Sequence, residues 1–247
     1  MTAVSDTSGS IDRLLTTATS SDEATRGAQI AVLPVGSFEQ HGSHLPLMTD
    51  TIVACAIAKA VADEYNLFLL PPITVSCSHE HAGFPGTVSI RATTLYTLIN
   101  DIADSLDRAG IRAVALVNGH GGNYVLSNIV QEANERGHRM ILFPRREDWD
   151  TGRREAGMAT NAHEDMHGGE LETSLLLHLD KTLVGVDFAT ADHDALRRPD
   201  LLTLGMTGYT ASGIIGRPSL ADSAKGAALL SSLSRSFLEA SDVLASL

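Results

Sequence analysis

Residues 30–36 read Ile-Ala-Val-Leu-Pro-Val-Gly, a short run that is apolar almost throughout and ends at a glycine. A strand covered by helices on both faces has this composition, because neither set of its alternating side chains meets water. After a polar segment, Asp50 opens a helical pattern with apolar residues three and four apart, which ends near Asn66. A buried strand followed by such a helix predicts the first βα unit of a parallel sheet.

The same alternation of strands and helices continues along the chain. Further strands are expected at 67–70, 112–117 and 139–143, and further helices at 93–109 and about 123–136. Helices of this length between strands imply right-handed βαβ crossovers and a mostly parallel sheet with helices on both faces. The predicted fold class is therefore α/β with three layers. Residues 1–28 are interpreted as an N-terminal lead-in segment and residues 29–247 as a single domain.

The composition excludes several classes of partner. The 247 residues carry a formal charge of −12, from 30 acidic and 18 basic residues, which disfavours nucleic acid and anionic membranes. No run approaches the roughly 18 apolar residues that span a bilayer, and the first ten residues do not resemble a secretory signal. A cytoplasmic protein is predicted. Cys55 and Cys77 are too few for a disulfide framework and are expected to be reduced thiols.

A first polar segment, residues 36–44, reads Gly-Ser-Phe-Glu-Gln-His-Gly-Ser-His and follows the strand at 30–35 directly. In an extended backbone Glu39 and His41 lie on the same side, where they can serve one metal ion or two adjacent ones. Asp50, nine residues further on, can return as a third ligand and suits a bridging role. Plainer interpretations exist, because Glu39 and His41 can be a surface pair and Asp50 a helix N-cap.

A second polar segment, residues 117–123, reads Val-Asn-Gly-His-Gly-Gly-Asn and again follows an apolar strand. The glycines allow close approach of the backbone to a ligand, and His120 offers one nitrogen to a metal. Gly-rich turns also bind phosphate, but this one lacks the Lys-Ser/Thr ending of a P-loop and the spacing of a dinucleotide fingerprint. Ligands of α/β sheets bind beyond the carboxyl ends of the strands, so both segments are expected at one edge.

A third polar segment, residues 163–174, reads His-Glu-Asp-Met-His-Gly-Gly-Glu-Leu-Glu-Thr-Ser and runs into an apolar stretch. Glu170 and Glu172 lie two apart at the expected start of a helix and so point in different directions. One can be a ligand while the other interacts with the helix dipole, and position alone does not choose between them. His178, within the apolar stretch, is interpreted as a packed core residue.

The segment 79–81, His-Glu-His, stands before a Gly-Phe-Pro-Gly turn and is interpreted as pocket lining or structure rather than as a ligand set. Any one of the three polar segments is a weak signal, whereas their coincidence at element ends is a strong one. Three carboxylates with two imidazoles form a mixed oxygen and nitrogen donor set that suits Zn²⁺ or Mn²⁺.

At these residues the sequence resembles the creatininase family, whose members carry Glu-x-His, an Asp nine residues later, Asn-Gly-His, and His-(Gly/Ala)-Gly-x-x-Glu-Thr-Ser. The resemblance implies a two-metal hydrolase of amide C–N bonds, often a hexamer, with Zn²⁺ first and Mn²⁺ or Fe²⁺ as alternatives. Creatinine-hydrolysing members place a Glu ligand where this chain has Gly122. The branch with Asn-Gly-His-Gly-Gly takes this carboxylate from the Glu-Thr-Ser motif. The ligands that the resemblance implies are Glu39, His41, Asp50, His120 and Glu172.

The function predicted on this basis is metal-dependent hydrolysis of a non-peptide or peptide-like amide C–N bond in a small-molecule substrate. Two ions would share a hydroxide of lowered pKa while one polarises the carbonyl. His167 is the candidate general acid, its plainer interpretation being a hydrogen-bond donor behind the ligands. Trp149, the only tryptophan, cannot build the aromatic gate of creatinine-specific members alone and is interpreted as a loop anchor, which argues against creatinine as substrate.

Two alternatives to this function remain. One is a deformylase or small-peptide amidase in cofactor or natural-product biosynthesis, because the same branch of the family includes a formamidopyrimidine deformylase and a peptidase that trims a cofactor precursor. The other is a non-catalytic, metal-stabilised assembly protein that kept the fold.

Overall fold

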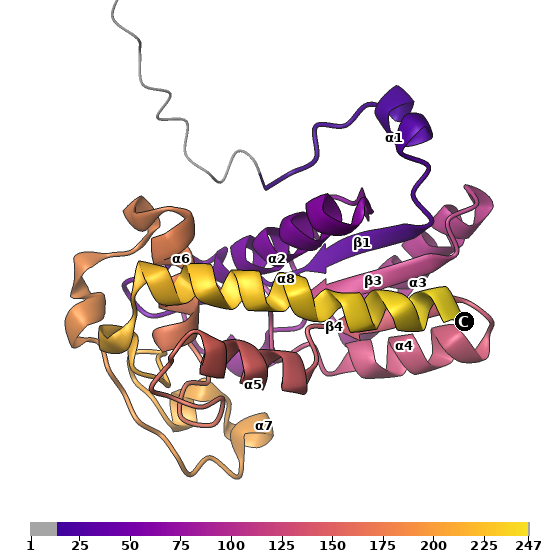
Figure 1. Ribbon diagram of the computed structural model, residues 1–247. Helices are drawn as coiled ribbons and strands as arrows, with labels where there is room; N and C mark the ends of the chain where they lie inside the picture. The colour runs from indigo at the N-terminus through magenta and orange to yellow at the C-terminus, as the bar shows by residue number, and fades with distance from the viewer. Residues whose placement is uncertain (1–13, 247) are drawn as a thin grey trace, which may run out of the picture.

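In the computed structural model, which describes residues 14–246, four parallel strands form one sheet in the order β2-β1-β3-β4 (Figure 1). The first thirteen residues of the predicted lead-in lie outside the described part of the chain. Pairing is continuous in the centre of the sheet, where Ile30 to Val35 stand opposite Ala113 to Asn118. The strands are β1 (Ile30–Val35), β2 (Phe68–Leu69), β3 (Ala113–Asn118) and β4 (Arg139–Phe143).

Helices cover both faces of this sheet, which confirms the predicted three-layer α/β fold (Figure 1). One face packs against α2, α6 and α8, and the other against α3 and α4, while α5 lies beside α8. The helices are α1 (Ser20–Arg26), α2 (Thr49–Tyr65), α3 (Ala92–Arg108), α4 (Val125–Glu135), α5 (Arg146–Glu155), α6 (Glu170–Leu179), α7 (Leu201–Leu204) and α8 (Ser223–Ser246).

The strands are apolar throughout because alternate side chains enter two different cores. Val32 packs with Ile57 and Phe237 on the side of α2 and α8. Its neighbour Leu33 packs with Ile99 on the side of α3 and α4. Burying one such side chain contributes about 1.5–3 kcal/mol, so both helical layers are held by the hydrophobic effect. Both cysteines are buried free thiols, and Cys77 belongs to the second of these cores.

The boundaries of the elements differ little from the prediction. The helix expected from Asp50 begins at Thr49 and ends at Tyr65, where Asn66 adopts a left-handed conformation with φ of 54°. The strand expected at 67–70 shrinks to the two residues of β2, an edge strand followed by two prolines that cannot donate hydrogen bonds. Within residues 14–246, no helix combines the length and the apolar composition needed to cross a bilayer.

The order of the strands locates a binding site. From β1 the chain crosses to β2 on one side, and from β3 it crosses to β4 on the other, so the order reverses between the two central strands. A crevice forms beyond the carboxyl ends of the strands at such a switch point. Residues 180–222, which contain only short helical turns, gather near α6 at the same end of the molecule (Figure 1). Ile215 in this segment forms backbone hydrogen bonds with His167.

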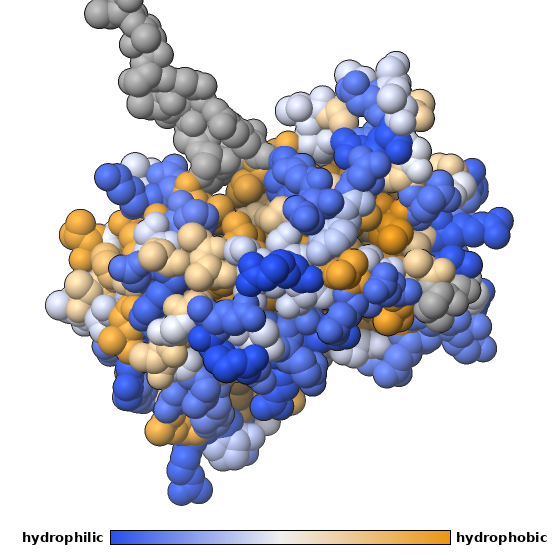
Figure 2. Space-filling model, viewed as in Figure 1, coloured by the Kyte–Doolittle hydropathy of each residue, from blue (hydrophilic) through white to orange (hydrophobic). Residues whose placement is uncertain are grey.

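The described residues form no large apolar patch on the face crossed by α8. Figure 2 shows hydrophilic residues over most of that face, with apolar side chains in small separate groups. Scattered apolar side chains of this kind are normal on soluble folds and indicate no binding surface by themselves.

Candidate metal centre

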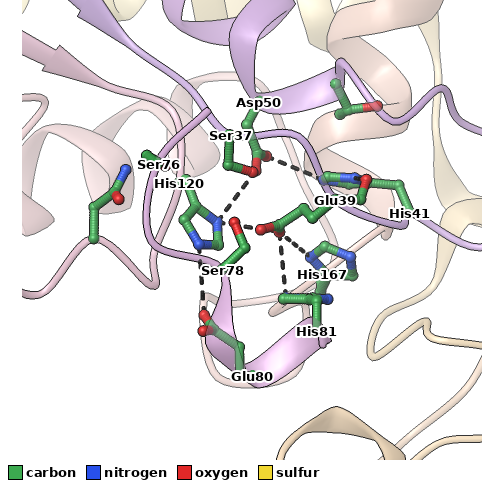
Figure 3. A network of polar contacts seen from close by, with 12 residues as sticks. Ser37, Glu39, His41, Asp50, Ser76, Ser78, Glu80, His81, His120 and His167 are labelled. Carbon is green, nitrogen blue, oxygen red and sulfur yellow. Dashed lines mark hydrogen bonds and ion pairs between the residues drawn. The ribbon is translucent and has the colours of Figure 1, made fainter. Parts of the chain in front are cut away.

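The three polar segments meet beyond the carboxyl ends of β1 and β3 (Figure 3). All five side chains predicted as ligands lie in this cluster, together with His167. Their donor atoms fall into three groups, within each of which the atoms lie no more than 4.8 Å apart. The groups are Glu39, Asp50 and His120; His41, Asp50 and Glu172; and Glu39, His41 and His167.

Asp50 is shared by two of these groups. Its Oδ1 lies 3.0 Å from Nε2 of His41, and its Oδ2 lies 3.1 Å from Nδ1 of His120. Ser37 Oγ donates a hydrogen bond to Oδ2 at 2.7 Å, which orients the carboxylate. The interpretation of Asp50 as an N-cap is wrong, because Met48 occupies that position and Asp50 lies in the first turn of α2 with its side chain in the cluster. The positive end of the helix dipole favours its charge there.

Glu39 has the least satisfied polar group of the cluster. Its side chain is completely buried, and Oε1 lies 3.1 Å from Nδ1 of His120 and 3.2 Å from Nε2 of His81. Neither approach has hydrogen-bond geometry, and among the described residues both carboxylate oxygens are without a hydrogen-bond partner. Burial raises the pKa of Glu39 and Asp50 raises it further, while His120 opposes the shift.

A cation would remove this deficit. An uncompensated buried carboxylate costs several kcal/mol, and coordination of a divalent ion is one of the few ways to offset that cost. Glu39 and its surroundings therefore fit a metal-binding role.

The backbone holds His41 and His120 in the tautomer that a metal ligand needs. His41 Nδ1 lies 3.1 Å from the carbonyl oxygen of Glu39, and His120 Nε2 lies 3.0 Å from that of Cys77. A carbonyl oxygen only accepts, so these nitrogens carry hydrogen, and the opposite nitrogens face the carboxylates.

The carboxylates also control the charge of these two imidazoles. Burial lowers the pKa of both rings. Asp50 and Glu172 around His41, and Glu39 and Asp50 around His120, nevertheless raise each pKa well above its usual value overall. A cation at the same atoms would replace those protons.

The sequence left open whether Glu170 or Glu172 is a ligand, and the structure places the two side chains in different surroundings. Glu172 points into the cluster, with Oε1 3.7 Å from His41 Nε2 and Oε2 accepting a hydrogen bond from Gly168 N at 2.6 Å. Glu170 points away, where its carboxylate accepts hydrogen bonds from the backbone of Thr160 at 2.9 Å and from Lys225 Nζ at 2.5 Å. Of these two glutamates, only Glu172 is placed to contact an ion held by His41.

His167 is enclosed by the other imidazoles. Its ring centroid lies 4.1 Å from that of His41 and 4.3 Å from that of His81. Nε2 donates to the carbonyl oxygen of Gln40 at 2.6 Å, so the lone pair of the neutral ring is on Nδ1, 3.7 Å from Glu39 Oε1. Burial and the charge of His41 lower the pKa of His167 to about 4. The ring is therefore neutral near pH 7.

The His-Glu-His segment forms one short turn, His79–His81, that closes the cluster from below in Figure 3. His81 is buried and accepts a hydrogen bond at Nδ1 from Gln40 Nε2 at 2.9 Å. It belongs to none of the three ligand groups, which agrees with its interpretation as lining. Sequence reasoning missed the contact of Glu80, whose Oε1 lies 3.5 Å from His120 Nε2.

The space beside Gly122 is occupied by the side chains of Glu80 and His120. A Cβ added to Gly122 would lie 1.9 Å from Oε1 of Glu80 and 2.4 Å from Nε2 of His120. Glu80, from a different loop, thus places a carboxylate oxygen 3.5 Å from Nε2 of His120 on this side.

A cavity of about 510 Å³ opens from the cluster towards α5. His120 and Glu172 line its inner end, and apolar walls come from Val53, Leu171 and Trp149. The interpretation of Trp149 as a loop anchor is wrong, because Trp149 lies within α5 and faces this cavity. The interpretation of His178 as a packed core residue is also wrong, because it is exposed near the end of α6.

Comparison with known proteins gives consistent matches over most of the chain. A family model described as creatinine amidohydrolase matches residues 15–241. The mycofactocin precursor peptide peptidase of Mycolicibacterium smegmatis is 34% identical over 206 residues, which cover 80% of this chain and 78% of that relative.

Solved structures match the fold. A creatininase described as a Mn form superposes with a TM-score of 0.78 at 25% identity, covering 91% of this chain and 95% of that chain. A creatininase variant described as Zn-Zn type gives a TM-score of 0.74 at 26% identity, covering 88% and 91%.

Proposed function

This chain belongs to the creatininase family, and we propose that it is a metal-dependent amidohydrolase whose ions are held where β1 and β3 end. The observation that carries the proposal is the buried carboxylate of Glu39, which lies among imidazole nitrogens and whose two oxygens accept no hydrogen bond from any described residue. One ion would be held by Glu39, Asp50 and His120, and a second by His41, Asp50 and Glu172, with Asp50 common to both. The ions, when bound, would supply a water of lowered pKa and polarise the amide carbonyl.

The donor set limits the choice of metal. Three carboxylates and two imidazoles with no thiolate suit Zn²⁺, and Mn²⁺ or Fe²⁺ as alternatives. The existence of Mn and Zn-Zn forms among the similar creatininases supports the first two.

His167 would move the proton. Its Nε2–H is held by the carbonyl oxygen of Gln40, so Nδ1 is free to accept a proton from the attacking water. Nδ1 would then return this proton to the leaving nitrogen. The lowered pKa of His167 makes its protonated ring a stronger acid than an ordinary imidazolium, which suits the second step.

The substrate we propose is a peptide-like amide rather than creatinine. A cavity of about 510 Å³ has room for a group much larger than one small ring. The identity of 34% to a peptide peptidase, against 29% to the creatinine amidohydrolase of Pseudomonas putida, also favours a peptide-like substrate. A deformylase remains the second candidate, since it would use the same ions and the same His167. We further propose a cytoplasmic homo-oligomer, a hexamer by family resemblance.

The test is metal content and turnover of the purified protein loaded with Zn²⁺ or Mn²⁺, on a panel of cyclic, linear and formyl amides. We expect hydrolysis of at least one amide class, lost on treatment with a chelator. Glu172→Gln should lose one ion and the activity, while Glu170→Gln, two residues away, should keep both ions and the activity. Metal-loaded protein without hydrolysis of any class would favour a non-catalytic assembly protein, and failure to bind metal would end the proposal.

A further inference from the structure

Arg146 lies at the outer end of the cavity that leads to the candidate metal centre. Its side chain is 86% exposed, and its ion pair within the described residues is a contact of 3.8 Å with Asp150, itself half exposed. An exposed pair of this kind contributes at most about 1 kcal/mol. The guanidinium of Arg146 is thus available to a ligand at little cost.

The second guanidinium that lines the cavity, that of Arg153, is already bound to another residue of the protein. Arg153 is buried and donates to the carboxylate of Asp165 at 2.9 Å and to the backbone oxygen of Asp165 at 3.1 Å. Asp165 in turn accepts hydrogen bonds from the first backbone N–H groups of α6, which carries Glu172. This pair holds the wall of the cavity together and leaves Arg146 as the cation facing its opening.

The remaining wall is apolar. Trp149 stands one helical turn after Arg146, and residues three apart lie on the same face of a helix. Val53 and Leu171 face the same space from α2 and α6. A ligand group seated between Glu172 and Arg146 would therefore meet apolar surface along its length and a guanidinium at its end.

We propose that this cavity binds an apolar part of the substrate that ends in a free carboxylate, and that Arg146 is the specificity-determining residue. The proposal rests on the amidohydrolase function above and names its substrate class. A guanidinium fork matches a carboxylate in geometry and charge. One such group balances one negative charge, whereas a phosphate ester would bring nearly two into a cavity already lined by Asp150, Asp165 and Glu172.

The matched probes are N-acetyl-alanyl-phenylalanine and its C-terminal amide, which differ only in the charge of the terminal group. Turnover of the Ala–Phe bond by the Zn²⁺- or Mn²⁺-loaded protein is followed by chromatography. We expect the acid to have a kcat/KM about 3–10-fold above that of the amide, carried by KM, as one bidentate contact with a largely exposed guanidinium predicts. Arg146→Ala should abolish this preference, so that the acid is cleaved no faster than the amide, and Arg146→Lys should restore part of it.

Arg154→Ala is the control, since Arg154 is an exposed arginine of the same helix that does not line this cavity. It should behave as the parent protein. Equal kcat/KM for acid and amide, or a preference that survives Arg146→Ala, would overturn the proposal.

A binding measurement separates this proposal from the hydrolase function. Calorimetry compares N-acetyl-phenylalanine with its amide on the metal-loaded parent, Arg146→Ala and Arg154→Ala proteins. Tighter binding of the acid that requires Arg146 supports the carboxylate site even if neither dipeptide is cleaved. Equal binding of acid and amide refutes the carboxylate site, whatever the turnover shows.

Discussion

Oδ2 of Asp50 lies 3.1 Å from Nδ1 of His120, although the two residues follow different strands. The other oxygen of Asp50 faces His41, so one carboxylate joins two groups of possible ligands. Glu172, by contrast, belongs to one group only. The two carboxylates should therefore differ in how many ions depend on them.

We predict that Asp50→Asn loses both ions and Glu172→Gln loses one. The reason is that a neutral amide at position 50 weakens both donor sets, while the change at Glu172 leaves Glu39, Asp50 and His120 intact. Metal content after dialysis, measured by mass spectrometry, checks the stoichiometry. Circular dichroism establishes that each variant is folded, and two tightly held ions in Asp50→Asn would contradict the assignment of a shared ligand.

Gly122→Ala should weaken metal binding at least tenfold, because its Cβ must displace Glu80 or His120. The neighbouring Gly121→Ala is the matched control, since a Cβ there meets nothing within 4 Å. Metal affinity is measured by competition with a fluorescent chelator. Equal affinity of the two variants would show that the position of His120 does not depend on this packing.

His167→Ala should retain both ions and lose about 10²–10⁴-fold in kcat, the usual contribution of a positioned proton-transfer group. Its Nδ1 faces the cluster, whereas Nε2 is bound to the carbonyl oxygen of Gln40. Steady-state kinetics on whichever amide the panel identifies, with metal analysis of the same samples, separates the two effects. A variant that loses metal along with activity would mark His167 as a ligand instead.

Glu170→Gln should destabilise the protein at neutral pH without removing metal. Burial raises the pKa of Glu170, but the hydrogen bonds from Lys225, Thr160 and the backbone of Ala159 lower it below 4.5 overall. A carboxyl whose pKa is lower in the folded state stabilises above its unfolded pKa, and this contribution is lost as pH falls through the folded value. We expect the free energy of unfolding of Glu170→Gln to be about 2 kcal/mol below that of the parent protein at pH 7.

This difference should shrink below about pH 4.5, where the unfolded carboxyl also binds a proton. Urea unfolding of both proteins at pH 7 and pH 4, in the presence of EDTA so that metal binding does not contribute, measures it. A stability difference that is independent of pH would assign the loss to packing rather than to the charge of Glu170.

Most of the fold is predictable from the sequence because its signals are local. The strand at 30–35 and the helix after Asp50 are specified by which residues are apolar and how they are spaced. The prediction was least accurate for β2, where edge position and the following prolines shortened the pairing.

The candidate site was predictable only as three segments. A polar run at the end of a strand predicts the edge of the sheet at which its residues lie. It does not predict the direction in which each side chain points. Trp149 was misjudged for this reason, because its place on a cavity depends on how α5 packs beside α8. Glu80 was missed because its contact with His120 joins two loops that no local pattern connects.

By itself, therefore, the sequence determined a parallel α/β sheet, the three polar segments at its edge and their resemblance to a metallohydrolase family. Only the tertiary structure decided that Glu172 rather than Glu170 enters the cluster, and that Arg146 and Trp149 face the same cavity. The physical reason is the distance along the chain over which these signals act, because periodicity and turn chemistry depend on residues that are close in sequence. A binding site, by contrast, depends on distances between side chains that only the packing of helices and strands brings together.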